Sequence, residues 1–220
     1  MFSSDASGDQ NLLRTSLLGS QPPVPLPGGV GQTPVKRDIA ESWIREGNTL
    51  VFMIWGTAAD RTLQAMSLDG SGPPEVLSKD QFASDEHHVS PDGRWLAYIS
   101  QESGHFEVYV EPFRRPGEKV RVSPNGGGQP RWRADGKEIF YLTPDGRLMA
   151  ASVREAATGL EVGIPTTLVP ADRLKAVVQG MDYDDYAVSS NGQRFLVKVA
   201  DSKNVRQRIH VLLDWTPAVP

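Results

Sequence analysis

One short phrase recurs four times along the 220-residue chain: a tight turn closed by a glycine, followed by a run of apolar residues. The clearest copy has its turn at residues 90–93 and its apolar run at residues 95–100. The four copies occupy residues 44–54, 90–100, 133–143 and 189–199. Their turn glycines, which are 46, 43 and 56 residues apart, are Gly47, Gly93, Gly136 and Gly192. A repeat of this kind specifies a scaffold made of one supersecondary unit used several times.

The period and the residue pattern together predict an all-β fold. Apolar residues alternate or form short runs, and 21 glycines and 17 prolines interrupt them, so long helices are excluded. A period near 40 to 45 residues is typical of the four-stranded blades of β-propellers. We therefore expect a β-propeller of about four to five blades, either complete or as part of a larger propeller. The expected blades span about 38–77, 85–123, 128–169 and 181–215.

One blade shows its strands in the sequence. Its turn residues separate four candidate strands, at residues 86–89, 95–100, 107–111 and 119–123. Residues 2–8 share the pattern of residues 99–104, which is the end of a second strand and the turn after it. We thus predict a partial first blade at residues 1–30 and four blades within residues 31–220, as the C-terminal part of a longer protein.

A blade with missing strands leaves a strand edge unpaired. This predicts either self-association through open blade edges or closure of the ring by pairing of residues 209–213 with the N-terminal remnant.

Composition excludes several function classes. The net charge is −4, and the basic residues are scattered, so we expect no nucleic-acid partner. Without cysteine, neither disulfides nor thiolate metal sites can form. The N-terminus lacks the pattern of a signal peptide, and no segment approaches the roughly 18 apolar residues of a membrane helix. We expect no direct membrane insertion and no cofactor.

Residues 90–100 and 107–110 resemble the repeat of TolB-family propellers, also called the WD-like or PD repeat. More narrowly, five segments resemble the C-terminal propeller of bacterial eukaryotic-like serine/threonine protein kinases: residues 107–113, 123–133, 137–142, 192–197 and 211–215. That resemblance implies a sensor or protein-binding module on the periplasmic or extracytoplasmic side of a membrane. The Gly-rich, His-Arg-Asp and Asp-Phe-Gly kinase loops are absent, so kinase activity is not implied.

Catalytic motifs are absent from the sequence. No serine lies in a Gly-x-Ser-x-Gly elbow, the turn that presents the nucleophile of esterases and related peptidases. We therefore predict a non-enzymatic binding module with no catalytic residues. The alternative is a hydrolase, as in esterase, peptidase-associated or glycoside hydrolase propellers, whose site is dispersed over the channel-mouth loops.

Three groups of polar residues invite a chemical role. His87 and His88 follow two acids, but neighbours on a strand point to opposite faces, so they cannot converge into a metal site. Asp182, Asp184 and Asp185 could hold a weakly bound cation. The acids of the Asp-Gly turns are predicted to cap the local backbone; they are Asp92, Asp135 and Asp145. Aromatics at matching repeat points are predicted to pack between blades; they are Trp95, Trp132, Phe140, Tyr141, Tyr186 and Phe195.

Binding sites of propellers lie where loops of several blades meet at the mouth of the channel. The predicted inner strands begin near residues 85–87, 129–131 and 183–186. We therefore predict a binding site for a protein or small-molecule ligand at these strands. The predicted ligand-binding residues are Asp85, His87, Gln129, Arg131, Tyr183 and Tyr186.

Overall fold

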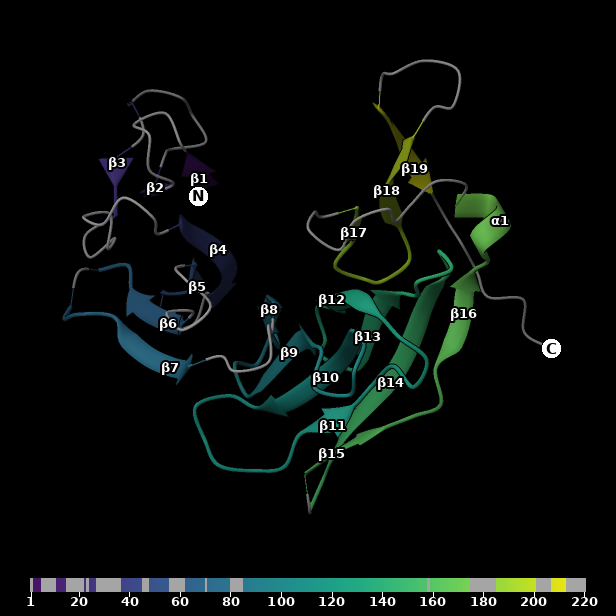
Figure 1. Ribbon diagram of the computed structural model, residues 1–220, viewed down its shortest axis with the longest axis horizontal. Helices are drawn as coiled ribbons and strands as arrows, with labels where there is room; N and C mark the ends of the chain where they lie inside the picture. Colours follow the sequence, from purple (N-terminus) through teal and green to yellow (C-terminus); the bar gives the residue numbers. More distant parts are fainter. Residues whose placement is uncertain are drawn as a thin grey trace. The chain divides into compact units, whose positions relative to one another are not determined.

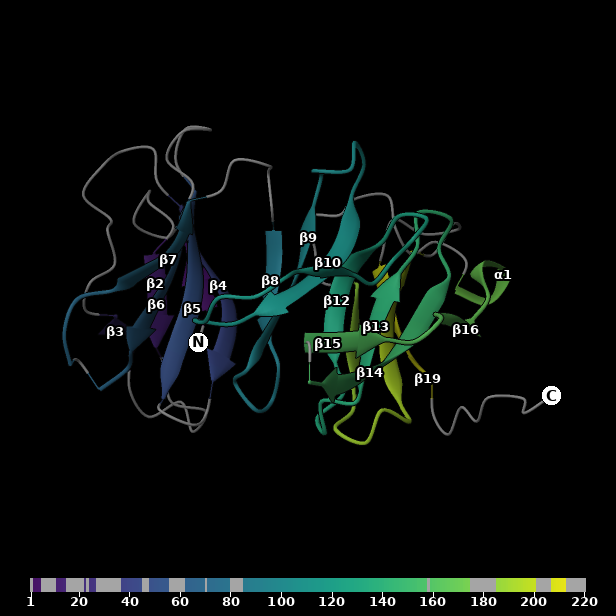
Figure 2. The same ribbon diagram turned by 90° about the horizontal axis from the view of Figure 1, so that it is seen from below.

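The structure is a computed structural model, and its chain forms two compact units, Met1–Ala83 and Ser84–Pro220. It describes residues 2–4, 11–14, 22, 24–26, 37–44, 48–55, 62–69, 71–79, 85–157, 159–174, 185–200 and 207–212. Antiparallel sheets dominate both units (Figures 1 and 2). The all-β prediction is confirmed.

The first unit contains two sheets. The first sheet has three strands, β1 (Phe2–Ser4), β2 (Asn11–Arg14) and β3 (Val24–Pro25), in sequence order. The second sheet has four, again in sequence order: β4 (Arg37–Ile44), β5 (Thr49–Trp55), β6 (Thr62–Ser67) and β7 (Glu75–Lys79). Buried side chains of both sheets form one apolar cluster, which includes Leu12, Leu26 and Phe52.

The second unit begins with the third sheet, whose strands were predicted individually. They are β8 (Asp85–Val89), β9 (Trp95–Ser100), β10 (Glu107–Pro112) and β11 (Val120–Arg121), paired in sequence order. The first three predicted strands are confirmed to within one residue. The outer strand is shorter than the predicted 119–123.

The fourth sheet has five strands. They are β12 (Gly128–Trp132), β13 (Glu138–Leu142), β14 (Leu148–Ala156), β15 (Gly159–Val162) and β16 (Thr166–Val169). The long strand β14 pairs with β15 through one part and with β16 through another. The predicted division of the chain into blades stays a prediction.

One helical turn, α1 (Ala171–Leu174), follows the fourth sheet. The fifth sheet comprises β17 (Tyr186–Val188), β18 (Phe195–Ala200) and β19 (Gln207–Leu212), so the strand nearest the C-terminus pairs with β18. Within the described part of the chain, no helix is long and apolar enough to cross a membrane.

The repeated turn joins the first two strands of the third, fourth and fifth sheets. Gly93, Gly136 and Gly192 have φ of 71°, 71° and 72°, a left-handed conformation that favours glycine, as predicted for the first two. Acids cap these turns: Asp92 accepts the Arg94 N–H at 3.1 Å, and Asp135 accepts the Lys137 N–H at 3.0 Å. Gly47 lies outside the described residues.

The core of the second unit lies between successive sheets. On one side of the fourth sheet, Ile139 and Tyr141 pack against Trp95 and Val108 of the third sheet. On the other side, Phe140 packs against the fifth sheet, with its ring edge-on to that of Phe195 at 5.1 Å between centroids. The predicted packing of repeat-equivalent aromatics between sheets is confirmed for these residues.

Replacing Gly136 with valine tests the turn geometry. A Cβ at Gly136 would meet only Pro91, at 3.9 Å, so the penalty comes from the backbone conformation and not from crowding. We expect Gly136→Val to lower the free energy of unfolding by about 1 to 3 kcal/mol. Urea unfolding measures the loss, and Lys137→Val, at the exposed next residue, is the matched control. Equal stability of both variants would contradict the assigned turn.

Candidate functional site

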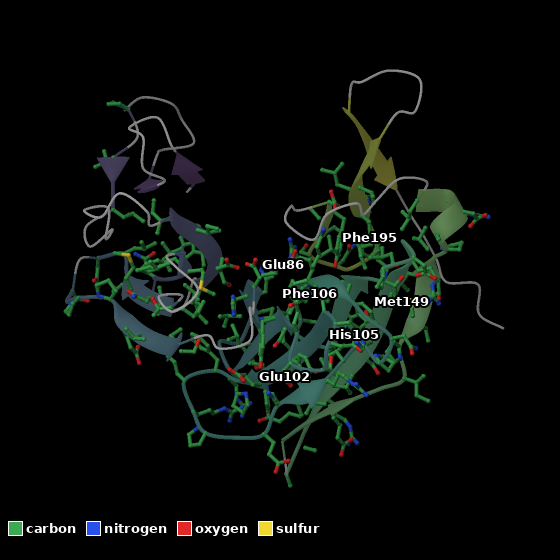
Figure 3. The ribbon with its side chains drawn as sticks, in the orientation of Figure 1. Glu86, Glu102, His105, Phe106, Met149 and Phe195 are labelled. Carbon is green, nitrogen blue, oxygen red and sulfur yellow. The ribbon has the colours of Figure 1, made fainter. Side chains whose placement is uncertain are left out.

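The first strands of the third and fourth sheets, β8 and β12, carry the same irregularity. In each, two residues of the strand lie opposite one residue of its partner: residues 86 and 87 opposite residue 98, and residues 129 and 130 opposite residue 141. This is a β-bulge, which bends the strand and re-aims its side chains. The extra residues, Glu86 and Gln129, both have a left-handed φ of 54°. Figure 3 shows Glu86 on β8.

Gln129 connects three sheets through hydrogen bonds. Its backbone N–H donates to the carboxylate of Glu86 at 2.5 Å. Its side-chain amide donates to Asp185 Oδ2 at 2.9 Å and accepts the Asp185 N–H at 2.8 Å. The hydroxyl of Tyr186 donates to the Gln129 carbonyl at 2.8 Å. Since Gln129 is only 2% exposed, these bonds satisfy a buried polar side chain.

Side chains from three sheets meet around Arg131, and we call His88, Arg131 and Tyr186 the Arg131 cluster. The guanidinium donates to His88 Nε2 at 2.5 Å and to the Pro130 carbonyl at 2.8 Å. It also lies over the Tyr186 ring, 5.8 Å from the centroid, a cation–π arrangement. Because a guanidinium can only donate, His88 Nε2 accepts and the ring proton lies on Nδ1.

The electrostatic environment keeps both histidines of β8 neutral. Burial, together with the positive charge of Arg131 and the adjacent His87, holds the pKa of His88 well below 6.5. Burial lowers the pKa of His87 to about 3. The His87 ring stacks on Tyr98 of β9, with centroids 5.7 Å apart. Tyr98 in turn donates to Glu111 at 3.0 Å.

The structure brings together some of the predicted ligand-binding residues. Gln129, Arg131 and Tyr186 lie in one contact network, as the position of their strands predicts. Asp85 caps its own strand by accepting the Glu86 N–H at 2.9 Å. His87 is 2% exposed and packs within its sheet. Tyr183 lies outside the described residues, and the binding role of the set stays a prediction.

Three members of the network are not among the predicted ligand-binding residues. Glu86 and Asp185 bond to Gln129, and His88 bonds to Arg131. A signal for two of them was present: Glu86, Gln129 and Asp185 each lie seven residues before a turn glycine. His88 aligns instead with Arg131, since each lies five residues before its turn glycine, but this alignment does not reveal that the two side chains bond to each other.

A second polar cluster, in the third sheet, contains a serine, a histidine and an acid. The fully buried Glu107 accepts a hydrogen bond from Ser123 Oγ, and its other oxygen contacts His105 Nε2 at 2.9 Å. The carboxylate therefore lies between the serine and the histidine. A serine nucleophile needs the imidazole, not the carboxylate, to take its proton. This arrangement does not activate Ser123.

Glu107 instead fixes the glycine-rich connection between β11 and β12. It accepts the Gly126 N–H at 3.0 Å, and the Gly127 N–H donates to the Phe106 carbonyl at 3.0 Å. A Cβ at Gly127 would lie within 3 Å of Ser123 and Tyr141. The glycines of this connection are thus buried and held in place.

The predicted cation site is only partly within the described residues. Asp185 is described and bonds to Gln129, whereas Asp182 and Asp184 are not described. Among the residues that the structure covers, no three acids or histidines gather as a metal ligand set.

Comparison with known sequences finds no protein-family profile that matches this chain. It finds no matching curated protein either.

Comparison with solved structures places the fold among TolB-like β-propellers. TolB from Acinetobacter baumannii superimposes with a TM-score of 0.67 at 17% identity, over 96% of this chain and 48% of that chain. A putative TolB from Agrobacterium tumefaciens gives 0.54 at 18%, over 75% and 58%. A puromycin-hydrolyzing peptidase from Mycobacterium tuberculosis gives 0.64 at 19%, over 92% and 33%. The chain thus spans about half the length of the first TolB.

Acid should destabilise the fold through the histidines of β8. Their pKa values are lower in the folded chain than the unfolded value near 6.5, so stability is complete above pH 6.5 and is lost as the pH falls below it. For His87 the loss between pH 7 and pH 5 is about 2 kcal/mol. His87→Phe keeps an aromatic ring next to Tyr98 and should remove that part of the dependence.

Denaturant unfolding at pH 7 and pH 5 measures this effect. Arg121→Gln, at an exposed arginine of β11, is the control and should lose as much stability between the two pH values as the parent chain. A parent chain equally stable at both pH values would contradict the burial of neutral histidines.

Proposed function

We propose that this chain is a non-catalytic, TolB-like β-propeller module that binds a protein or small-molecule ligand at the Arg131 cluster. The observation that carries the proposal is the convergence of His88, Arg131 and Tyr186 from three successive sheets. The Arg131 guanidinium offers charge and hydrogen-bond donors and the neutral His88 imidazole a further hydrogen bond, while the buried Tyr186 ring supports the guanidinium from inside. Arg131 and His88 are half-buried, so a ligand can reach them.

The arrangement of Ser123, Glu107 and His105 supports a role without catalysis. Of the described residues it comes nearest to a hydrolytic triad, but its carboxylate separates serine from histidine and two of its members are fully buried. The hydrolase alternative rests on the fold that this chain shares with the Mycobacterium tuberculosis peptidase. The superposition covers only 33% of that protein. A shared fold does not carry a shared site.

Binding is tested by titrating the isotopically labelled chain with acidic, neutral and basic nonapeptides while amide NMR signals are recorded. We expect one peptide class to shift the signals of residues 129–132 and 186 saturably. Arg131→Gln should weaken that binding at least tenfold, the loss of about one charged hydrogen bond. Arg121→Gln, at an exposed arginine of β11, is the matched control and should bind like the parent chain.

Two results would contradict this function. One is the absence of any shift at these residues with all three peptides. The other is hydrolysis of a model ester, peptide or glycoside that disappears in Ser123→Ala, His88→Gln or an equivalent single variant.

We further propose that the module is the sensor region of a larger signalling protein. The kinase-propeller resemblance of residues 107–113, 123–133 and 211–215 supports this role. The test is the reading frame of the genomic DNA upstream of the Met1 codon. An in-frame kinase domain and membrane span are expected, and an in-frame stop codon directly upstream would contradict the sensor role while leaving the binding test unaffected.

A further inference from the structure

The same repeat position carries a hydrogen-bonding side chain in three successive sheets. Glu86, Gln129 and Asp185 each stand seven residues before the turn glycine of their sheet. Glu86 and Gln129 are the extra residues of their bulges and share a φ of 54°. A left-handed non-glycine residue is costly and persists where the surrounding structure requires it.

The bulge explains why the backbone at this position needs a partner outside the strand ladder. An extra residue in a strand loses its place in the ladder, so its N–H must bond elsewhere. The Gln129 N–H bonds to the side chain of Glu86 in the preceding sheet. In turn, the Asp185 N–H bonds to the side chain of Gln129. The side chains of Glu86 and Gln129 thus each take up the backbone N–H of the same position in the next sheet.

We propose that this position is an inter-sheet lock, and that Gln129 is the residue that positions the Arg131 cluster. The second part rests on the proposed function. Gln129 accepts from the Asp185 backbone and donates to its carboxylate. Its carbonyl also receives the Tyr186 hydroxyl, which places the ring under Arg131. An amide carries a donor and an acceptor on one rigid group, so the Gln129 side chain makes both bonds at once.

Reversing the polarity of the lock tests it. In Gln129→Glu the side chain can still accept the residue 185 N–H, but it faces the Asp185 carboxylate with no proton to share. Relative to the parent chain at the same pH, we expect a lower unfolding midpoint at pH 8 and partial recovery at pH 5, where a proton can be shared. Adding Asp185→Asn supplies a donor, and the double variant should regain most of the loss at pH 8. Gln101→Glu, in an exposed turn, is the matched control for the added charge.

Hydrogen exchange reads the lock directly and needs no ligand. Gln129→Ala should raise the exchange rate of the residue 185 amide at least tenfold, and that of residues 97 and 108 far less. An unchanged rate at residue 185, or a double variant no more stable than Gln129→Glu alone, would overturn the lock.

The positioning role has its own readout. In Gln129→Ala, the peptide that binds the parent chain should bind at least fivefold more weakly, although Arg131 is intact. Unchanged peptide affinity together with fast exchange at residue 185 would overturn the positioning role. If no peptide binds the parent chain, the proposed function fails, while exchange at residue 185 still decides the lock.

Discussion

Burial of both faces of a sheet between its neighbours is the constraint on which the second unit depends. In β13 every residue from Ile139 to Leu142 is buried, with alternate side chains directed to the third and the fifth sheet. A sheet buried on both faces has no polar face to direct toward solvent. Its orientation is therefore set by the sheets that pack against it. The edge-on pair Phe140 and Phe195 contributes about 0.5 to 1.5 kcal/mol beyond simple burial.

Contacts between apolar faces do not fix the rotation of one sheet against the next. In the described residues, a few buried polar groups fix it. Gln129 joins the backbone of the fourth sheet to that of the fifth, and Glu107 holds the connection that enters β12. Such groups are costly if unsatisfied, so their bonds select one arrangement among several of similar apolar burial. The Arg131 cluster depends on that selection, because its three members come from three sheets.

The fold is shared with propellers of unlike function. TolB and the puromycin-hydrolyzing peptidase both superimpose on this chain, at identities of 17% and 19%. A scaffold of stacked sheets leaves function to the side chains at strand ends, where small changes alter charge without altering packing. The shared fold therefore does not decide between a binding and a hydrolytic role, and the proposed function rests on the side chains of the Arg131 cluster.

Local pattern alone determined the scaffold. The turn glycines, the capping acids and the strands at 95–100 and 107–111 are features of neighbouring residues, and the structure confirms them. The repeat also indicated strands whose residues meet in the structure, since Gln129, Arg131 and Tyr186 lie in one contact network.

Only the tertiary structure decided the partners of those residues. The contact of His88 with Arg131 joins residues 43 positions apart, and that of Gln129 with Asp185 joins residues 56 apart. The bulges that aim these side chains arise from pairing between strands, and the fixed glycine connection depends on Glu107 from another strand. Hydrogen bonds between sheets depend on distances that no local pattern encodes. This is the physical reason why the sequence indicates the strands of the Arg131 cluster and not the contacts among its side chains.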